Sequence, residues 1–284
     1  MRIPVPELDE RYSCSEDAIE HLIHICTVIV NKAKKVYPTP SISDMPGYVL
    51  EFCCKVLRQT TTLNRVARER EDYNTLCSLV RMLADSIATI NLVYCAKDDE
   101  ERIIRHLLYV LDGVSARYKM LDGRPVEYNG TIPRETYEAL CAQVQGAKDN
   151  AVKCIEYCVT TIRKSPVYSI KKDAFELLIH NKNWKFKTVD KPKSRDAYTW
   201  KEMYGMTGVK LADEMFPFLS QYVHGLSVSN IAIDDKDDFD APLSFAYCLL
   251  YWLFEFLRGL YEPQIEEYTM EDIRKMVPEL FQHV

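Results

Sequence analysis

The sequence has few of the residues and motifs that mark several common protein classes. It contains nine glycines and thirteen prolines in 284 residues, so few turns interrupt it and long elements are expected. It has no Walker loop, no Gly-x-Ser-x-Gly elbow and no His-Glu-x-x-His sequence. The common phosphate-binding, hydrolase and metalloprotease mechanisms therefore have no support.

Metal-binding and disulfide patterns are also missing. No two of the ten cysteines form a Cys-x-x-Cys pair, and most lie in apolar helical runs, where cysteine behaves as a small hydrophobic residue. His21 and His24 share a helix, but no obvious third ligand accompanies them, so neither a metal nor a cofactor is predicted. The N-terminus lacks the apolar core of a secretory signal, and we expect a reduced, cytoplasmic setting.

The charge of the chain is uneven. A formal net charge of -6 argues against a protein that coats nucleic acid with its whole surface. Residues 163–195, however, contain ten Lys or Arg against three acidic residues. Any nucleic-acid contact is therefore expected within this segment.

Period-two alternation is absent, whereas helical periodicity is widespread. In residues 73–96, apolar side chains recur at alternating intervals of three and four, and the opposite face carries small or apolar groups. A helix without a charged face is usually buried on several sides. We predict an all-α, multi-helix bundle with a buried central helix near residues 73–96.

The other expected helices follow the same pattern. They are predicted from about residues 15–35, 46–70, 100–121, 133–165 (with a break at Gly146), 209–224, 241–258 and 270–280. The polar, basic residues 181–198 form a linker or loop between an N-terminal bundle, 1–180, and C-terminal helices, 199–284, that pack on the same bundle. A single domain is the alternative.

Two further stretches are candidates for membrane binding and cation binding. Residues 241–254 carry no charge, but this run is too short to span about 30 Å of hydrocarbon. A buried core helix is favoured, and a membrane-peripheral role rests on this run alone. Residues 234–240 are acidic, yet they lack the glycine and distal glutamate of an EF-hand, so an acidic helix start is the simpler interpretation.

The candidate catalytic group centres on the central helix. Arg81 and Asp85 are its only charged residues, and their four-residue spacing places them side by side. Ser220 and His224 share a face of a later helix at the same spacing. If the two faces met, His224 could pair with Asp85, and the group could bind phosphate or act as acid and base. The alternative is a polar clamp that locks helices together.

A second candidate, for nucleic-acid binding, is the basic and aromatic segment within residues 171–195. Its proposed contacts are Lys182, Trp184, Lys185, Lys187, Lys193 and Arg195. Lysines can contact phosphates while aromatic rings stack on bases. A solvated loop with two aromatic anchors, Trp184 and Phe186, explains the composition equally well.

Two strings carry a resemblance to a known family. SLVRMLADSIATINLVYCAKDDEE and FLSQYVHGLS resemble segments of a bacterial family of uncharacterised all-helical proteins. That family shows an Arg, an acidic residue four later and a Tyr before a Lys-Asp-acidic segment, and a separate Leu-Ser-x-Tyr-Val-His stretch. The matching positions here are Arg81, Asp85, Tyr94, Lys97, Asp98, Leu219, Ser220, Tyr222, Val223 and His224. The family usually has Glu where Asp85 stands.

Such proteins are distantly similar to HEPN domains, helical bundles that in prokaryotes are often RNases of toxin and phage-defence systems. The resemblance implies a bacterial or phage-related protein with an RNA-linked or defence role. HEPN nucleases carry an Arg that is followed, after four to six other residues, by a His. This sequence has no such pair. Arg102 and His106 have three residues between them, and exposed charge near Arg105 is the simpler explanation.

Two functions therefore stand as expectations. The first is an HEPN-like helical protein with a polar Arg81, Asp85 and His224 site, for which enzymatic activity is an open question. The second is a noncatalytic scaffold or protein-binding module. RNA or a partner protein is the expected partner, and no membrane span is expected.

Overall fold

A computed structural model describes residues 16–70, 72–123, 127–224 and 239–261 of the chain. Within these ranges the secondary structure is helical, and β-type pairing is limited to two isolated bridges. The helices are α1 (Glu16–Val36), α2 (Met45–Glu69), α3 (Tyr73–Tyr94), α4 (Asp99–Leu121), α5 (Arg134–Arg163), α6 (Pro166–Ile170), α7 (Lys172–Asn181), the 3₁₀ turn η1 (Ser194–Asp196), α8 (Trp200–Met206), α9 (Ala212–Val223) and α11 (Asp240–Tyr261). The prediction of an all-α bundle is confirmed.

Local sequence explains where the long helices begin and end. Asp72 precedes α3 and accepts a 2.9 Å hydrogen bond from the Thr75 N–H, and Asp98 precedes α4 and accepts one of 2.8 Å from the Glu101 N–H. These carboxylates satisfy N–H groups that lack a helical partner. Helix α2 ends where Arg70 adopts the left-handed conformation, with φ of 46°.

The chain divides into two compact units. The first contains Met1–Cys95 and Thr199–Val284, and the second contains Ala96–Tyr198. Residues 96–180, which the sequence places in an N-terminal bundle, thus lie in the second unit together with segment 181–198. The C-terminal α8, α9 and α11 pack with α1, α2 and α3 in the first unit, as a separate piece of chain that joins the same bundle.

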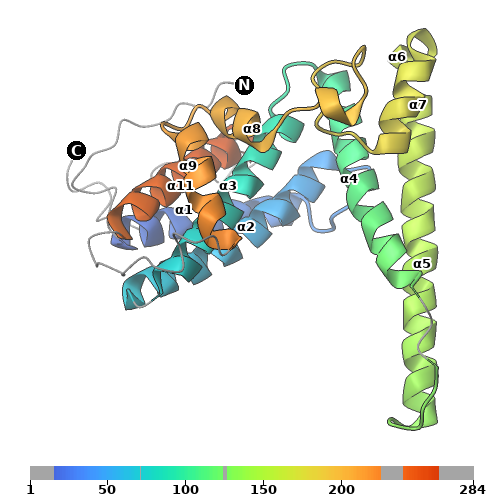
Figure 1. Ribbon diagram of the computed structural model, residues 1–284, viewed down its shortest axis with the longest axis horizontal. Coiled ribbons are helices and arrows are strands. Elements are labelled where there is room, and N and C mark those ends of the chain that lie inside the picture. The colour runs from blue at the N-terminus through green and yellow to red at the C-terminus, as the bar shows by residue number, and fades with distance from the viewer. Residues whose placement is uncertain (1–15, 71, 124–126, 225–238, 262–284) are drawn as a thin grey trace. The chain divides into compact units, whose positions relative to one another are not determined.

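Helix α3 is the centre of the first unit. It packs against α2, α8, α9 and α11, and α1, α2, α3 and α11 lie side by side in Figure 1. Both α3 and α11 are long and apolar enough to cross a membrane, but two thirds of each apolar window is buried inside the protein. Core helices share this property, so it is weak evidence for a span. The buried central helix is confirmed.

The second unit contains a hairpin of α4 and α5. Lys148 on α5 forms a 3.0 Å ion pair with Asp122, just after α4, and Glu100 at the start of α4 accepts a hydrogen bond from the Val167 N–H, just after α5. The two helices are therefore antiparallel. The expected break at Gly146 does not occur, because a single glycine costs a long helix only about 1 kcal/mol and α5 continues through it.

Two expectations lie outside the described residues. The final helix near residues 270–280 falls wholly there, as does most of the acidic stretch at 234–240. Of that stretch the structure describes Phe239 and Asp240, and Asp240 is the first residue of α11.

Candidate functional site

The Arg81 guanidinium is buried in the first unit, between α3, α8 and α9. Its side chain is 11% exposed. Phe216 from α9 and Tyr204 from α8 place their rings beside the guanidinium carbon, at 4.2 Å and 5.3 Å from ring centre. Contact with aromatic faces stabilises a cation removed from water. The two rings also pack edge to face, 5.2 Å apart.

Hydrogen bonds use the polar edges of the same guanidinium. The Arg81 Nε donates to Asp85 Oδ1 at 3.0 Å. Its Nη1 donates to the Phe216 carbonyl at 3.2 Å and to the Ser220 hydroxyl. The predicted Arg81 and Asp85 pair is therefore present, and Ser220 joins it, so three of the four proposed catalytic residues converge. Tyr204 and Phe216 complete the group, which we call the Arg81 cluster: Arg81, Asp85, Tyr204, Phe216 and Ser220.

Asp85 holds its position by accepting two hydrogen bonds at one oxygen. The Tyr204 hydroxyl donates to Asp85 Oδ1 at 2.9 Å, beside the bond from Arg81. Burial raises the pKa of the Asp85 carboxyl, and the Arg81 charge and the two hydrogen bonds oppose this rise. Burial also raises the pKa of the Tyr204 hydroxyl well above its ordinary value, and the Asp85 charge adds to the increase. The phenol therefore stays protonated as a donor.

The expected contact between His224 and Asp85 is not present. Helix α9 ends at Val223, and His224 follows it as an exposed residue whose backbone N–H bonds the Ser220 carbonyl at 3.2 Å. Within the described part of the chain, no hydrogen bond or ion pair joins its imidazole to Asp85. The four-residue spacing along α9 does not determine how closely the end of that helix approaches α3, so it could not decide this contact.

The chemistry open to the Arg81 cluster is limited by these bonds. The Ser220 hydroxyl donates to the Phe216 carbonyl at 2.6 Å, so its proton is directed to a peptide group and not to a base. A nucleophilic serine needs a base within hydrogen-bond reach. The cluster therefore joins three helices, as the clamp interpretation requires, and the predicted imidazole of His224 is not bonded to Asp85 within it.

Sequence reasoning did not identify Tyr204 and Phe216. Tyr204 lies on α8, a short helix that the periodicity did not predict. A signal was present, because Thr199 and Glu202 form a capping box, with Thr199 accepting from the Glu202 N–H at 3.2 Å and Glu202 accepting from the Thr199 N–H at 2.7 Å. This Thr-x-x-Glu pattern can be read from sequence.

A second buried arginine organises the basic segment in the other unit. The Arg105 side chain is 3% exposed, donates to the Trp184 carbonyl at 3.0 Å and lies 4.1 Å from the ring centre of Phe186. His106 is buried as well. The expectation of exposed charge near Arg105 is therefore wrong, because the carbonyl and ring from residues 184–186 enclose this part of α4.

The aromatic side chains of the basic segment face the interior. Trp184 is 8% exposed and Phe186 is 2% exposed, and the Trp184 indole N–H donates to Asp112 at 3.3 Å. Base stacking needs an open ring face, so Trp184 is placed as an anchor and not as a stacking platform. The structure places Lys187, Lys193 and Arg195 at exposed positions, and Lys182 and Lys185 at half-buried ones.

We call the segment that these anchors hold, residues 182–198, the basic loop. The Tyr198 N–H donates to the Lys185 carbonyl at 2.8 Å, and Asn183 donates from its side chain to the Pro192 carbonyl at 3.1 Å. A β-bridge joins Phe186 to Ala197. These bonds fix the backbone that carries the lysines, which makes the loop an ordered surface of positive charge.

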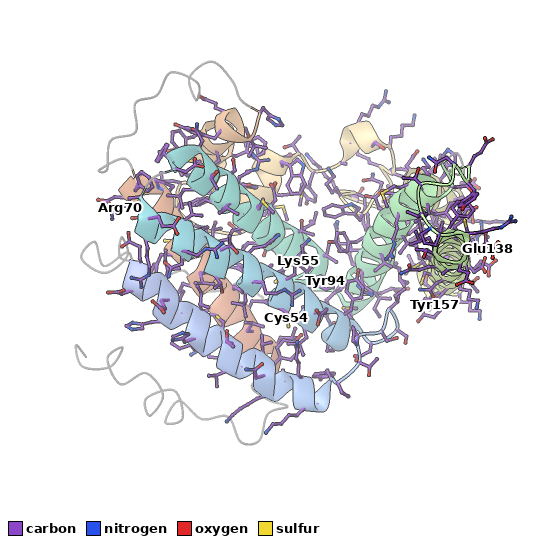
Figure 2. The ribbon with its side chains drawn as sticks, turned by 90° about the horizontal axis from the view of Figure 1, so that it is seen from below. Cys54, Lys55, Arg70, Tyr94, Glu138 and Tyr157 are labelled. Atoms are coloured by element: carbon purple, nitrogen blue, oxygen red, sulfur yellow. The ribbon has the colours of Figure 1, made fainter. Side chains whose placement is uncertain are left out.

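Metal ligands do not gather in the described residues. No three His, Cys, Asp or Glu side chains there come together in a way that could hold a metal ion. The described cysteines are free thiols, and six of them are buried: Cys26, Cys53, Cys54, Cys77, Cys158 and Cys248. Figure 2 shows Cys54 on α2 within the helices of the first unit.

Comparisons with known proteins add no relative to this picture. No family model matches the chain, and neither a curated protein nor a solved structure shows significant similarity to it.

Proposed function

We propose that this protein is a noncatalytic helical module that binds a partner protein. The observation that carries the proposal is the state of the Arg81 cluster. The guanidinium lies against two rings and bonds three protein groups, while the imidazole of His224 is outside the cluster. An arginine whose Nε and Nη1 donors bond to protein groups connects helices and has few donors left for a substrate, and ion-pair networks of this kind often serve structure alone.

Exposed apolar side chains support the binding part of the proposal. On α5, Leu140 is 48% exposed and Val144 is 40% exposed, although both belong to the apolar stripe of their helix. An apolar stripe that the described residues of a chain leave open is a common mark of a protein-binding helix. The module therefore presents α5 and keeps the Arg81 cluster internal.

A cleavage assay with matched variants tests the noncatalytic assignment. End-labelled RNA incubated with the full chain should remain intact, and His224→Ala should leave thermal unfolding unchanged, because the side chain is exposed and surface substitutions usually stay within about 0.5 kcal/mol. The opposing result is cleavage that is lost in His224→Ala and in Arg81→Lys while both variants remain folded. That result would establish a catalytic site.

An HEPN-like, RNA-linked role is the second candidate, in a form that binds without cleaving. The basic loop supports it, because its buried aromatic anchors hold Lys187, Lys191 and Lys193 at exposed positions. Neutralised phosphates release counterions, so affinity for RNA should fall steeply with salt. Bacterial origin and a defence setting remain part of this candidate through the family resemblance alone.

A charge-matched pair of triple variants tests RNA binding. Lys187→Ala, Lys191→Ala and Lys193→Ala together should reduce the slope of log K against log salt by about 2, at about 0.7 for each contact to single-stranded RNA. Lys35→Ala, Lys55→Ala and Lys201→Ala remove the same charge from other exposed positions and should change the slope little. Equal slopes in both variants, measured by fluorescence anisotropy, would contradict a specific role for the basic loop.

A further inference from the structure

The net positive charge of the second unit lies in the basic loop. Residues 96–198 contain 19 Lys or Arg and 15 Asp or Glu, a net charge of +4. The basic loop alone, residues 182–198, contains six basic and two acidic residues, which is also +4. The remainder of the chain, outside residues 96–198, has a net charge of -10. This distribution directs a polyanion to the basic loop and away from the rest of the protein.

Four basic side chains of the loop are exposed: Lys187, Lys191, Lys193 and Arg195. The two acidic residues of the loop offset little of this charge. Asp190 forms a 2.8 Å ion pair with Lys171, a lysine from outside the loop. Asp196 lies 4.0 Å from Arg195, whose side chain is 78% exposed, and such a pair is weak in water. The loop therefore presents four cations to solvent.

The three aromatic rings of the loop are engaged within the protein. Trp184 is 8% exposed and Phe186 is 2% exposed, and the rings of Trp184 and Tyr109 pack edge to face, 5.3 Å apart. The third ring, that of half-buried Tyr198, has the Lys187 ammonium 5.4 Å from its centre. Base stacking needs an open ring face. Phosphate contact is therefore the interaction with nucleic acid for which the loop is built.

We infer that the basic loop binds the phosphate backbone of double-stranded nucleic acid and does not read its base sequence. The inference deepens the RNA-binding candidate function and rests on it. A duplex carries about one negative charge for each 1.7 Å of its axis, twice the density of one strand. A single strand usually offsets its lower charge by stacking bases on aromatic side chains, and the rings of the loop are engaged elsewhere.

The ordered backbone of the loop favours a duplex for a second reason. The Tyr198 N–H donates to the Lys185 carbonyl at 2.8 Å, and the Asn183 side chain donates to the Pro192 carbonyl at 3.1 Å. The cations are thus carried on a fixed frame. A DNA duplex is stiff over about 150 base pairs, so its phosphates are already in place, whereas a single strand must lose conformational freedom to follow the loop.

Fluorescence anisotropy of the full chain with labelled duplexes and single strands of equal length tests the inference. For about four phosphate contacts, counterion release at about 50 mM salt should favour the duplex by about tenfold. Two duplexes of unrelated sequence should bind equally, and oligouridine should bind as weakly as oligoadenosine. RNA and DNA duplexes are separate arms, because both present the same phosphate chemistry, and the tighter one identifies the source.

A pair of charge-matched variants locates the binding. Lys191→Glu combined with Lys193→Glu should weaken duplex binding by about a hundredfold at about 50 mM salt, because two phosphate contacts are lost. Lys55→Glu combined with Lys201→Glu makes the same change in net charge at exposed positions outside the loop. This control should bind the duplex as the native chain does. Circular dichroism should be the same for both variants, because all four side chains are exposed.

Each outcome decides the inference. Single strands that bind as tightly as duplexes, or that differ between uridine and adenosine, would overturn it and leave the RNA-binding candidate standing. Poly-glutamate that displaces the duplex at equal charge concentration would assign the loop to acidic proteins instead. A chain that binds no nucleic acid would remove the RNA-binding candidate as well. The noncatalytic assignment is separate from all three results, since it depends on the RNA cleavage assay.

Discussion

Arg81→Ala should lower the free energy of unfolding by about 3 kcal/mol, as an order of magnitude for breaking a buried ion pair. The substitution removes the donor to Asp85, the donor to the Phe216 carbonyl and the cation between two rings. It also opens a cavity between α3, α8 and α9. The Asp85 side chain is 34% exposed, so water can solvate part of the remaining charge and the effect falls at the low end of the range for buried pairs.

The measurement is chemical denaturation followed by circular dichroism, with two comparison variants. Arg58→Ala also removes an arginine from an ion pair, with Glu51 at 3.8 Å, but its side chain is 67% exposed and the loss should stay below about 0.5 kcal/mol. Arg81→Lys keeps the positive charge but loses the planar guanidinium, so its free energy of unfolding should lie between those of Arg81→Ala and the native chain. An Arg81→Ala variant as stable as the native chain would contradict the clamp.

The same experiment separates a clamp from a functional site. A clamp residue affects folding first, and any loss of partner binding should follow the loss of folded protein. Unchanged stability combined with a lost activity would identify Arg81 as a site residue. The two outcomes cannot be confused, because the denaturation midpoint is measured independently of any ligand.

The long helices could be predicted from sequence because their signals are local. Helix α3 has an unbroken apolar stripe, an aspartate cap at Asp72 and no internal proline. Helix α8 was missed because seven residues are too few to show a period. The sequence analysis expected the C-terminal helices to pack on the N-terminal bundle, but it did not place residues 96–180 in a second unit, because no local pattern marks the boundary near residue 96.

The candidate site was predictable only where it lies on one helix. The pairing of Arg81 with Asp85 follows from four-residue spacing, which holds in any α-helix. The contacts of Arg81 with Tyr204 and Phe216 cross more than a hundred residues of sequence, and they depend on how α8 and α9 dock on α3. The predicted pairing of His224 with Asp85 depended in the same way on how the end of α9 docks on α3, which spacing along one helix cannot determine.

Composition was equally unable to place the aromatic residues of the basic loop. A tryptophan among lysines fits both a stacking surface and a buried anchor. What decides between them is the carbonyl of Trp184, which takes a bond from buried Arg105 at 3.0 Å. Arg105 lies on α4, in another part of the sequence. It is buried by residues 184–186, and its side chain in turn holds that segment in place.

Alkaline pH should destabilise the protein through Tyr204. The folded pKa of this hydroxyl is raised by burial and by the Asp85 charge, from an ordinary value of 10.0. Above pH 10 the unfolded chain releases the proton while the folded chain keeps it, so the folded state binds more protons and stability falls as pH rises. Tyr204 alone should contribute a slope of about 1.4 kcal/mol for each pH unit, or roughly 2.7 kcal/mol over two units.

The variant Tyr204→Phe should therefore be less stable than the native chain at neutral pH and more stable than it at high pH. At neutral pH the variant loses a charge-assisted hydrogen bond to Asp85 and should be less stable by about 1.5 kcal/mol. At alkaline pH it avoids the cost of keeping a phenol protonated. The two stability curves should cross near pH 11, about one unit above the ordinary tyrosine pKa, because one unit of slope offsets the hydrogen bond.

Two other tyrosines make the experiment specific. Burial also raises the pKa of Tyr261 above its ordinary value, and the Tyr261 hydroxyl donates to the Pro46 carbonyl at 2.7 Å. Because Tyr261 remains in the variant, Tyr204→Phe should still lose stability as pH rises, but less steeply than the native chain. Tyr157, which Figure 2 labels on α5, is 40% exposed, and Tyr157→Phe should follow the native curve. Parallel curves for Tyr204→Phe and the native chain would mean that the Tyr204 hydroxyl is not held against Asp85, and the Arg81 cluster would lose its hydrogen bond between Asp85 and α8.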